Sequence, residues 1–272
     1  MREKEYLALP AVNDFISWLE NILDTPQSFV HGYYHKKKRK RYDFDNLFSA
    51  YESYDWDRDY TIEELSDILM KSIVESDEKS CEDTCYKILE WGGVKNKGNK
   101  DRISALSPNV CTYLLAVQKR LEMDLPSSEY STPEMHMTSG FPKIHMTSGF
   151  SKIYSACNDQ YMIYDSRVGA ALGLLVRKFC EDKDLKNVPC ELQFAWTNGR
   201  GEQERNPNHG RYEFPKLRSN KKGEYLGHNI RANWLMSEVA KSTKSNFARL
   251  EPHFRLRALE QALFMIGYDI RQ

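Results

Sequence analysis

Apolar side chains recur at helical spacing along most of this chain. The clearest stripe runs from Val168 to Phe179, where apolar residues stand three, four and seven positions apart, and it predicts one long helix. Further stripes of the same period predict amphipathic helices over residues 11–24, 61–73, 81–91, 107–121, 228–240 and 252–266. The pattern therefore predicts a mainly α fold with few short strands.

Residues that start and stop helices delimit these stripes. Thr61 is followed three positions later by Glu64, with carboxylates in the first turn, which favours a helix start. Gly92 and Gly93 are typical of a helix end. Asp165 stands directly before the long stripe, in the position of an N-cap. We expect loops at 95–102, 126–133 and 198–227, and a short apolar segment at 191–196.

A nine-residue tandem duplication occupies residues 136–153. The copies differ only in having Pro142 or Ser151, and each contains a lysine, Lys143 or Lys152. Both copies suit a helical turn, since proline is tolerated at the start of a helix and serine leaves a normal amide. A functional loop that has been copied and a neutral duplication in a surface loop both explain the repeat. We take the second copy, nearer the long helix, as the working one.

Length and composition suit an ordinary globular protein. The chain has 272 residues, 40% hydrophobic and 29% charged, and it can bury a substantial core. It has no run of about 18 apolar residues that would span a bilayer. Pro10 and Asn13 interrupt the apolar start of the chain, which has no signal-peptide pattern. We therefore expect a cytoplasmic protein without a membrane partner.

The six cysteines are too scattered, in too long a chain, to suggest a disulfide framework, so we expect reduced thiols. Cys81 and Cys85, like His31 and His35, are four positions apart, which permits two metal ligands on one face. No second pair stands at zinc-site spacing, so we predict neither a metal site nor another cofactor. The lack of a cysteine cluster in the sequence also argues against an iron–sulfur protein.

The net charge of zero conceals an asymmetry. Residues 1–150 contain 19 Lys and Arg against 25 Asp and Glu, whereas residues 151–272 contain 20 against 14. Residues 42–90 are strongly acidic, and we expect them to face away from a polyanion. Residues 35–41 are a basic run flanked by tyrosines, which suits either a solvated loop or phosphate contact. The cationic carboxy-terminal half mildly favours a nucleic-acid partner.

The segment 145–180 contains, in order, a turn with Gly149, then Lys152, then Asp165 before the long helix. This order resembles the core of the helix-hairpin-helix superfamily of DNA glycosylases, in particular bacterial relatives of 8-oxoguanine DNA glycosylase. The likeness directly covers only this segment, which has one glycine where the family usually has two. It implies a helical DNA glycosylase fold with a helix-hairpin-helix-like core.

The resemblance also implies an acidic helical part over residues 1–130 and a glycosylase core over residues 131–272, packed as one unit. It implies that Asp165 is the catalytic carboxylate, stabilising positive charge that develops on the sugar. Lys152 is then either the nucleophile that attacks C1′ and permits strand cleavage, or a substrate-positioning residue. On composition alone, an Asp before a helix is most often simply an N-cap, and a lone Lys in a turn is almost always a solvated side chain.

A glycosylase extrudes its target nucleotide and stacks the base in a pocket. The region 198–227 interleaves arginines with aromatic residues, which suits backbone contact and stacking, and a solvated loop explains the same composition. The candidates for DNA or base binding are Gly149, Phe150, Ser151, Arg167, Trp196, Arg211, Tyr212, Phe214 and Trp234.

The expected function is excision of a modified base from double-stranded DNA, by a monomer and without a metal, to leave an abasic site. The resemblance suggests oxidised guanine as the substrate, or a modified base of phage DNA in antiviral defence. Two alternatives also bind DNA: a non-catalytic module, and a metal-dependent nuclease that uses Asp165 with a second carboxylate. A helical scaffold that binds a basic protein through residues 42–90 is a third alternative.

Overall fold

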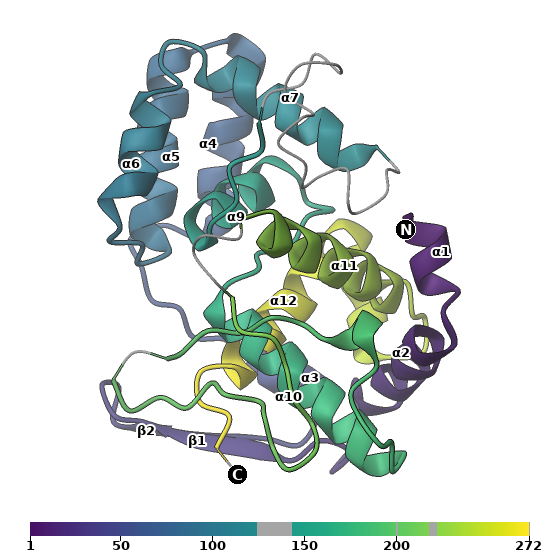
Figure 1. Cartoon of the computed structure of the whole chain (residues 1–272). Helices are drawn as coiled ribbons and strands as arrows, with labels where there is room; N and C mark the ends of the chain where they lie inside the picture. Colours follow the sequence, from purple (N-terminus) through teal and green to yellow (C-terminus); the bar gives the residue numbers. More distant parts are fainter. Residues whose placement is uncertain (124–142, 200, 218–221, 272) are drawn as a thin grey trace.

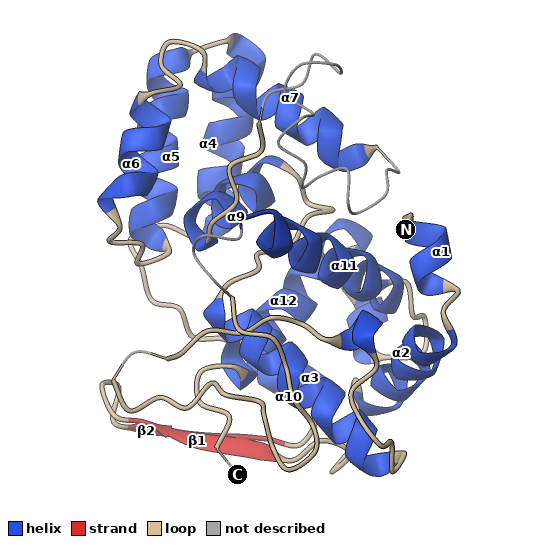
Figure 2. Ribbon diagram, in the orientation of Figure 1, coloured by secondary structure: helices blue, strands red, loops and turns tan. Residues whose placement is uncertain are grey.

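The computed structural model describes residues 1–123, 143–199, 201–217 and 222–271, and these are mainly helical, as Figure 1 and Figure 2 show. One two-stranded antiparallel sheet accompanies the helices in this part of the chain. The prediction of a mainly α fold with few short strands is therefore confirmed. The main elements are α1 (Glu3–Leu7), α2 (Pro10–Ile22), β1 (His31–His35), β2 (Lys40–Phe44), α3 (Leu47–Glu52), α4 (Ile62–Glu75), α5 (Glu78–Trp91), α6 (Lys97–Ser104), α7 (Val110–Glu122), α9 (Ser148–Cys157), α10 (Ser166–Asp182), η2 (Cys190–Leu192), α11 (Lys222–Ala240), η3 (Asn246–Arg249), η4 (Pro252–Phe254) and α12 (Arg255–Ile266).

Local signals account for the helices that the sequence predicts. Thr61 caps α4 by accepting a hydrogen bond from the backbone N of Glu64, whose side chain accepts one from the backbone N of Thr61. Gly93 follows α5 with a φ of 62°, a conformation that glycine adopts readily. The predicted core stripe of α12 is buried, at Leu256, Leu259, Leu263 and Ile266.

Two loops predicted from composition are partly helical. The polar stretch 95–102 contains most of α6, because the Asn96 side chain accepts a hydrogen bond from a backbone N of the first turn and caps the helix. The predicted loop 198–227 also ends earlier than expected, since α11 begins at Lys222. Polar composition concealed helical structure in both places.

The basic run 35–41 lies at the tip of a β-hairpin, where the sequence predicts a loop. β1 and β2 pair from His31 opposite Phe44 to His35 opposite Lys40. Buried and exposed residues alternate along most of both strands, as they do in a sheet with one covered face. The hairpin therefore rests on the helical body by one side and presents its cations to solvent.

Helices from both halves of the chain pack together in two groups. In one group α3, α10 and α11 contact α12, and α2 contacts α10 and α11. In the other, α9 packs against α4, α5 and α7. The predicted division at residue 130 lies outside the described residues, and each group contains helices from both sides of it.

α10 is buried on nearly all sides, which explains why apolar residues extend beyond a single stripe. Gly169 permits a close approach of the following chain, because a Cβ there would lie 2.6 Å from the carbonyl oxygen of Ala195. Neither α10 nor any other helix of the described residues has the length and apolar character to cross a bilayer.

The second copy of the duplication opens α9, which corrects the prediction of a glycine turn at 147–152. Thr147 accepts a hydrogen bond from the backbone N of Phe150 (3.1 Å) and caps the helix, so Gly149 and Lys152 are helical. Every residue from Gly149 to Cys157 is buried. All but the end of the first copy, and the predicted linker before it, lie outside the described residues.

Candidate functional site

Asp165 closes the amino-terminal end of α10. Its backbone is extended, and its Oδ1 accepts hydrogen bonds from the backbone N of Arg167 (2.9 Å) and of Val168 (3.2 Å). These bonds satisfy donors that the first turn of a helix leaves without partners. The N-cap interpretation is therefore confirmed, and it occupies one carboxylate oxygen.

Lys152 pairs with the other oxygen of this carboxylate. Its Nζ lies 3.0 Å from Asp165 Oδ2 and also donates to the carbonyl oxygen of Ser148 at 3.2 Å. The Lys152 side chain is 5% exposed and that of Asp165 13% exposed. Lys152 is thus a nearly buried cation held against a single carboxylate, and the interpretation of a solvated side chain is wrong.

Burial and charge act on Asp165 in opposite directions. Burial alone would raise the pKa of its carboxyl, but the charge and hydrogen bond of Lys152, with the charges of Arg167 and Arg205, hold that pKa well below its ordinary value. Asp165 is therefore ionised at neutral pH. Burial, with repulsion from Arg205, lowers the pKa of Arg167 to about 10, so Arg167 is still a cation at pH 7.

Gly92, the residue that ends α5, leaves room for the Lys152 side chain. A Cβ at Gly92 would lie 2.3 Å from Lys152 Cδ and 2.7 Å from its Cε. The φ of Gly92 is −73°, which any residue adopts, so space and not backbone conformation requires glycine here. The aliphatic part of the lysine therefore lies directly against the end of α5.

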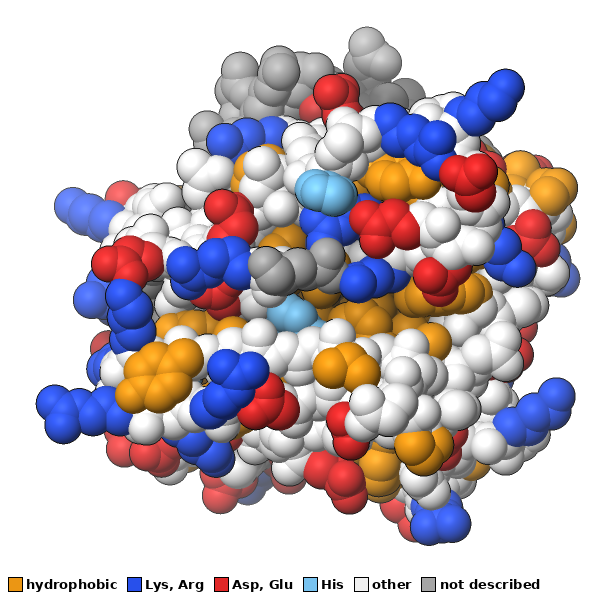
Figure 3. Space-filling model, turned by 90° about the horizontal axis from the view of Figure 1, so that it is seen from below, with side chains coloured by type: hydrophobic (Ala, Val, Ile, Leu, Met, Phe, Trp, Pro, Cys, Tyr) orange, Lys and Arg blue, Asp and Glu red, His pale blue; other side chains and the backbone are white. Residues whose placement is uncertain are grey.

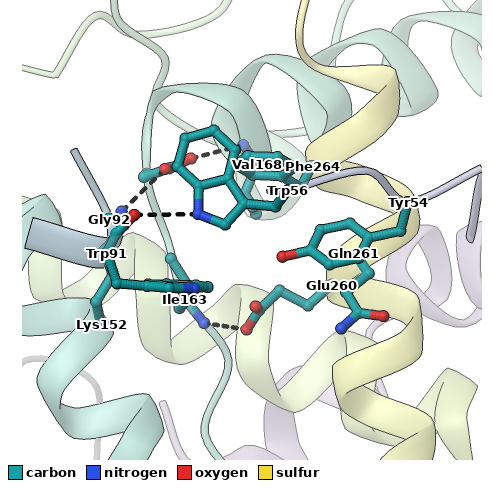
Figure 4. A pocket seen from close by; sticks show the side chains of 11 residues that line it. Tyr54, Trp56, Trp91, Gly92, Lys152, Ile163, Val168, Glu260, Gln261 and Phe264 are labelled. Atoms are coloured by element: carbon teal, nitrogen blue, oxygen red, sulfur yellow. Dashed lines mark hydrogen bonds and ion pairs between the residues drawn. The ribbon is translucent and has the colours of Figure 1, made fainter. Parts of the chain in front are cut away.

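The ion pair forms part of the wall of a pocket that Figure 4 shows from close by. Its cavity volume is about 20 Å³, room for about one water molecule. Its lining is mainly aromatic and aliphatic with a few polar groups, as is typical of small-molecule sites. The lining residues are Tyr54, Trp56, Trp91, Gly92, Lys152, Ile163, Asp165, Val168, Glu260, Gln261 and Phe264.

Trp56 is fixed by contacts on several sides. Its Nε1 donates to the carbonyl oxygen of Trp91 at 3.0 Å, and its ring meets those of Trp91 and Phe264 edge to face. The guanidinium groups of Arg58 and Arg167 lie 4.5 and 5.3 Å from its ring centroid, within the range of cation–π attraction. These contacts hold the Trp56 ring in the wall of the pocket.

Glu260 and Gln261 of α12 supply the other polar groups (Figure 4). Glu260 accepts a hydrogen bond of 2.5 Å from the backbone N of Ile163 and forms an ion pair of 2.7 Å with Arg257. Burial raises the pKa of Glu260, and Arg257 opposes this shift. The amide of Gln261 has no hydrogen-bond partner among the residues described, so it remains available to a ligand.

Arg167 is a predicted DNA-binding residue that does lie beside the pocket. Its guanidinium lies 3.9 Å from the ring centroid of Phe264 and 5.0 Å from that of Tyr268. A neighbouring guanidinium, that of Arg205, is fixed by a hydrogen bond to Ser166 Oγ. Two cations therefore stand at the start of α10.

Gly149, Phe150 and Ser151, also predicted to contact DNA, are core residues. The Ser151 hydroxyl accepts a hydrogen bond of 2.6 Å from the backbone N of Tyr164. A Cβ at Gly149 would lie 2.8 Å from Leu89 Cδ2, so glycine permits close packing of α9 on α5. None of the three has an exposed side chain with which to touch a nucleic acid.

Arg211 and Tyr212 lie at the far end of α10. The Tyr212 hydroxyl donates to the carbonyl oxygen of Cys180 at 3.0 Å. Cys180 follows Asp165 by fifteen positions, which separates them by about 22 Å at the rise of an α-helix. Arg211 pairs with Asp184 beyond the end of the helix. The structure therefore does not bring these two residues to the ion pair.

Trp196, Phe214 and Trp234 are buried and lie outside the pocket. Trp196 Nε1 donates to the carbonyl oxygen of Phe214 at 3.3 Å, which fastens the 201–217 segment to the body of the protein. The ring of Trp234 packs against Tyr6 at 5.9 Å between centroids. These aromatic residues have structural contacts in place of the predicted base contacts.

The aromatic residues that do line the pocket were missed by the sequence analysis. Tyr54 and Trp56 belong to the acidic region 42–90, which was expected to face away from DNA, and Trp91 follows it directly. Phe264 stands in a stripe that is typical of core. The sequence does place Tyr54 and Trp56 close to Arg58 in a short loop, and this combination of aromatic residues with a cation could have indicated a binding pocket.

No three His, Cys, Asp or Glu side chains are grouped so as to hold a metal ion within the described part of the chain. Cys81 and Cys85 are buried on α5. His31 and His35 lie on β1, where His31 meets the carbonyl oxygen of Asp269 at 3.0 Å and His35 stacks on Tyr268.

None of the protein-family models, curated proteins and solved structures compared with this chain matches it.

Proposed function

We propose that this protein is a DNA N-glycosylase that excises a modified base and leaves an abasic site. The observation that carries the proposal is the nearly buried ion pair between Lys152 and Asp165 in the wall of an aromatic pocket. Flat aromatic surfaces stack on extruded bases, and a carboxylate beside them suits a reaction that develops positive charge on the sugar.

Asp165 supplies the negative charge. Because its pKa is held below the ordinary value, the carboxylate stays ionised at neutral pH and opposes the positive charge of an oxocarbenium-like sugar. Its role as N-cap fixes its orientation, since two backbone N–H groups hold Oδ1. Oδ2 accepts a hydrogen bond from Lys152, and it is the oxygen that we assign to the reacting sugar or to an attacking water.

Lys152 supplies an amine at the same place. In the lyase form of the reaction, its electron pair forms a bond to C1′ and the glycosidic electron pair leaves with the base. The ammonium proton lost by Lys152 goes to the departing base, so charge and atoms balance. In the monofunctional form, water attacks C1′ and Lys152 positions the nucleotide by its charge.

The substrate class that we propose is a modified purine or pyrimidine, either oxidised guanine or a modified base of phage DNA. Gln261 offers both a donor and an acceptor among aromatic rings, which matches the polar edge of a planar base. The cavity has room for about one water molecule, so these rings must move apart to admit a base. A phage-base substrate would make the protein an antiviral factor. The proposed partner is double-stranded DNA with one flipped nucleotide, and Arg167 is the proposed phosphate ligand beside the pocket.

The test is incubation of the purified protein, with EDTA present, with 8-oxoguanine duplexes and with phage DNAs that carry natural base modifications, followed by alkali. We expect alkali-dependent breaks with the wild type and none with Asp165→Asn. Breaks that appear before alkali and disappear in Lys152→Met assign lyase chemistry to this lysine.

Two controls make the result specific. Circular dichroism and thermal unfolding establish that each variant is folded, and Arg211→Gln, far from the pocket, should cut like the wild type. Activity that needs a divalent cation would favour the nuclease alternative. Intact DNA on every substrate, with retained binding, would favour the non-catalytic module.

A further inference from the structure

The tip of the β1–β2 hairpin is a cluster of exposed cations that the proposed reaction does not use. Four residues, Lys36 to Arg39, connect the strands, and Lys40 and Arg41 continue the basic run. All six residues are exposed, although the side chain of Lys38 is only 30% exposed. Figure 3 looks at this end of the molecule and shows Lys and Arg side chains interspersed with Asp and Glu, without one continuous basic surface. Any anion contact here must therefore come from particular side chains.

Neighbouring carboxylates already pair with four of these cations. Lys38 lies 2.6 Å and Lys40 3.9 Å from Asp55, and the remaining two pairs are Lys36 with Glu202 and Arg41 with Asp43. Lys37 and Arg39 have no ion-pair partner among the described residues. These two are the cations that remain to meet an anion from outside.

The hairpin is seated next to the pocket by aromatic stacking. The rings of Tyr33 and His35 stack on Tyr268 at 4.8 and 4.2 Å between centroids. The guanidinium of Arg167 lies over the Tyr268 ring, 5.0 Å from the ring centroid. Arg167 donates its backbone N to Asp165, so one ring links the hairpin to the residues that hold the carboxylate. Figure 1 shows the carboxy-terminal segment reaching the two strands.

Chain geometry sets the reach of the two cations. Lys37 and Arg39 follow His35 by two and four residues, so their backbones lie within about 7 and 14 Å of His35 for an extended chain. Successive phosphates of one DNA strand rise about 3.4 Å along the helix axis. These upper limits keep Lys37 and Arg39 within about four phosphate spacings of His35, the hairpin residue that stacks on Tyr268 beside Arg167.

We propose that the tip of the β1–β2 hairpin binds the DNA backbone that flanks the extruded nucleotide, with Lys37 and Arg39 as the phosphate ligands. This rests on the proposed function, because the pocket defines which DNA segment lies beside the hairpin. The strands provide a rigid support, and Lys38 and Lys40, anchored on Asp55, hold the tip in place.

The test compares two double variants that each remove two positive charges. Lys37→Gln/Arg39→Asn removes the free cations, and asparagine suits the left-handed φ of 50° at position 39. The matched control is Lys183→Gln/Lys186→Gln, two exposed lysines beyond the far end of α10. Fluorescence anisotropy measures the affinity of each protein for a duplex with a stable abasic-site analogue across a series of salt concentrations.

The logarithm of the association constant falls as log salt rises. We expect this negative slope to become shallower by about 0.9 for each phosphate that the protein no longer neutralises, and so by about 1.8 in the hairpin variant. The control should keep the wild-type slope. Equal slopes for wild type and hairpin variant would overturn the proposal, and so would a wild type that does not bind DNA.

Binding and base release are measured separately, which distinguishes the two proposals. A reduced slope in the hairpin variant supports the hairpin contact even where no base is released. In that case the proposed excision fails while the DNA-binding surface stands.

Discussion

Each oxygen of the Asp165 carboxylate has a distinct partner. Oδ1 accepts hydrogen bonds from two backbone N–H groups, and Oδ2 accepts one from the ammonium of Lys152. Asparagine at this position can provide one acceptor oxygen only, so its amide nitrogen must face either the helix donors or the lysine. We therefore propose that this residue is a structural cap and a reactive group at the same time.

The first prediction concerns the strength of this pair. Lys152→Met leaves an uncompensated carboxylate in a nearly buried site, and we expect it to lower the free energy of unfolding by about 3 kcal/mol. Asp165→Asn should also destabilise, and the double variant should be less destabilised than the sum, with a coupling of about 1–3 kcal/mol. Urea unfolding of the four proteins measures the cycle. Strictly additive losses would show that the pair contributes no interaction energy.

The second prediction follows from the lowered pKa of Asp165. A carboxyl whose pKa is lowered on folding contributes stability that is fully present above its unfolded pKa, about 3.9, and is lost as the pH falls through the folded value. The difference in unfolding free energy between wild type and Asp165→Asn should therefore be constant from pH 7 to about 5 and should shrink below about pH 4. Unfolding curves across this range test it, and a difference that shrinks near pH 6 would contradict the assigned direction.

At the scale of elements, the end of α5 and the body of α9 meet at Gly92 and Lys152. We predict that Gly92→Ala displaces the lysine side chain and reduces base release at least tenfold, because the added Cβ occupies the place of Lys152 Cδ. Gly227→Ala on α11 is the control, since a Cβ there meets open space and should stabilise the helix by about 0.5–1 kcal/mol. Base release by both variants is measured in parallel with base release by the wild type. Unchanged release by Gly92→Ala would show that the lysine position is not critical.

The elements that could be predicted are those with local signals. The start of α10 was found because Asp165 precedes a strong apolar stripe, and α4 because Thr61 and Glu64 form a capping box. The turn predicted around Gly149 was wrong because Thr147 caps a helix there. The glycine serves close packing instead, because a Cβ at Gly149 would collide with the side chain of Leu89 on α5. The hairpin was missed because each strand has only five residues and the basic run 35–41 overlaps both strands.

The pocket belongs to the scale of the whole molecule, and this is why the sequence did not reveal it. Tyr54 and Trp56 come from the loop before α4, Trp91 from the end of α5, and Phe264 from α12. Only tertiary packing brings these segments to the ion pair. Lys152 and Asp165 were singled out from the sequence by a resemblance, but their ion pair was found only in the structure.

Thiol reactivity provides a prediction for the fold as a whole. Cys190 is exposed, whereas Cys81, Cys85, Cys111, Cys157 and Cys180 are buried. We expect one of the six thiols to react with a thiol reagent in the native protein and all six to react after unfolding. Reaction at Cys190 should be slow at pH 7, because the neighbouring Glu191 raises the pKa of this thiol. Rapid labelling of several native thiols would contradict the packing of α5, α7 and α9.

The measurement that tests the central claim most directly is mass spectrometry of the free bases released from modified DNA with EDTA present. The account predicts a released modified base with the wild type, in amounts equal to the abasic sites formed, and none with Asp165→Asn at the same protein concentration. Release that persists in Asp165→Asn, or DNA cut into fragments with every base still attached, would contradict it.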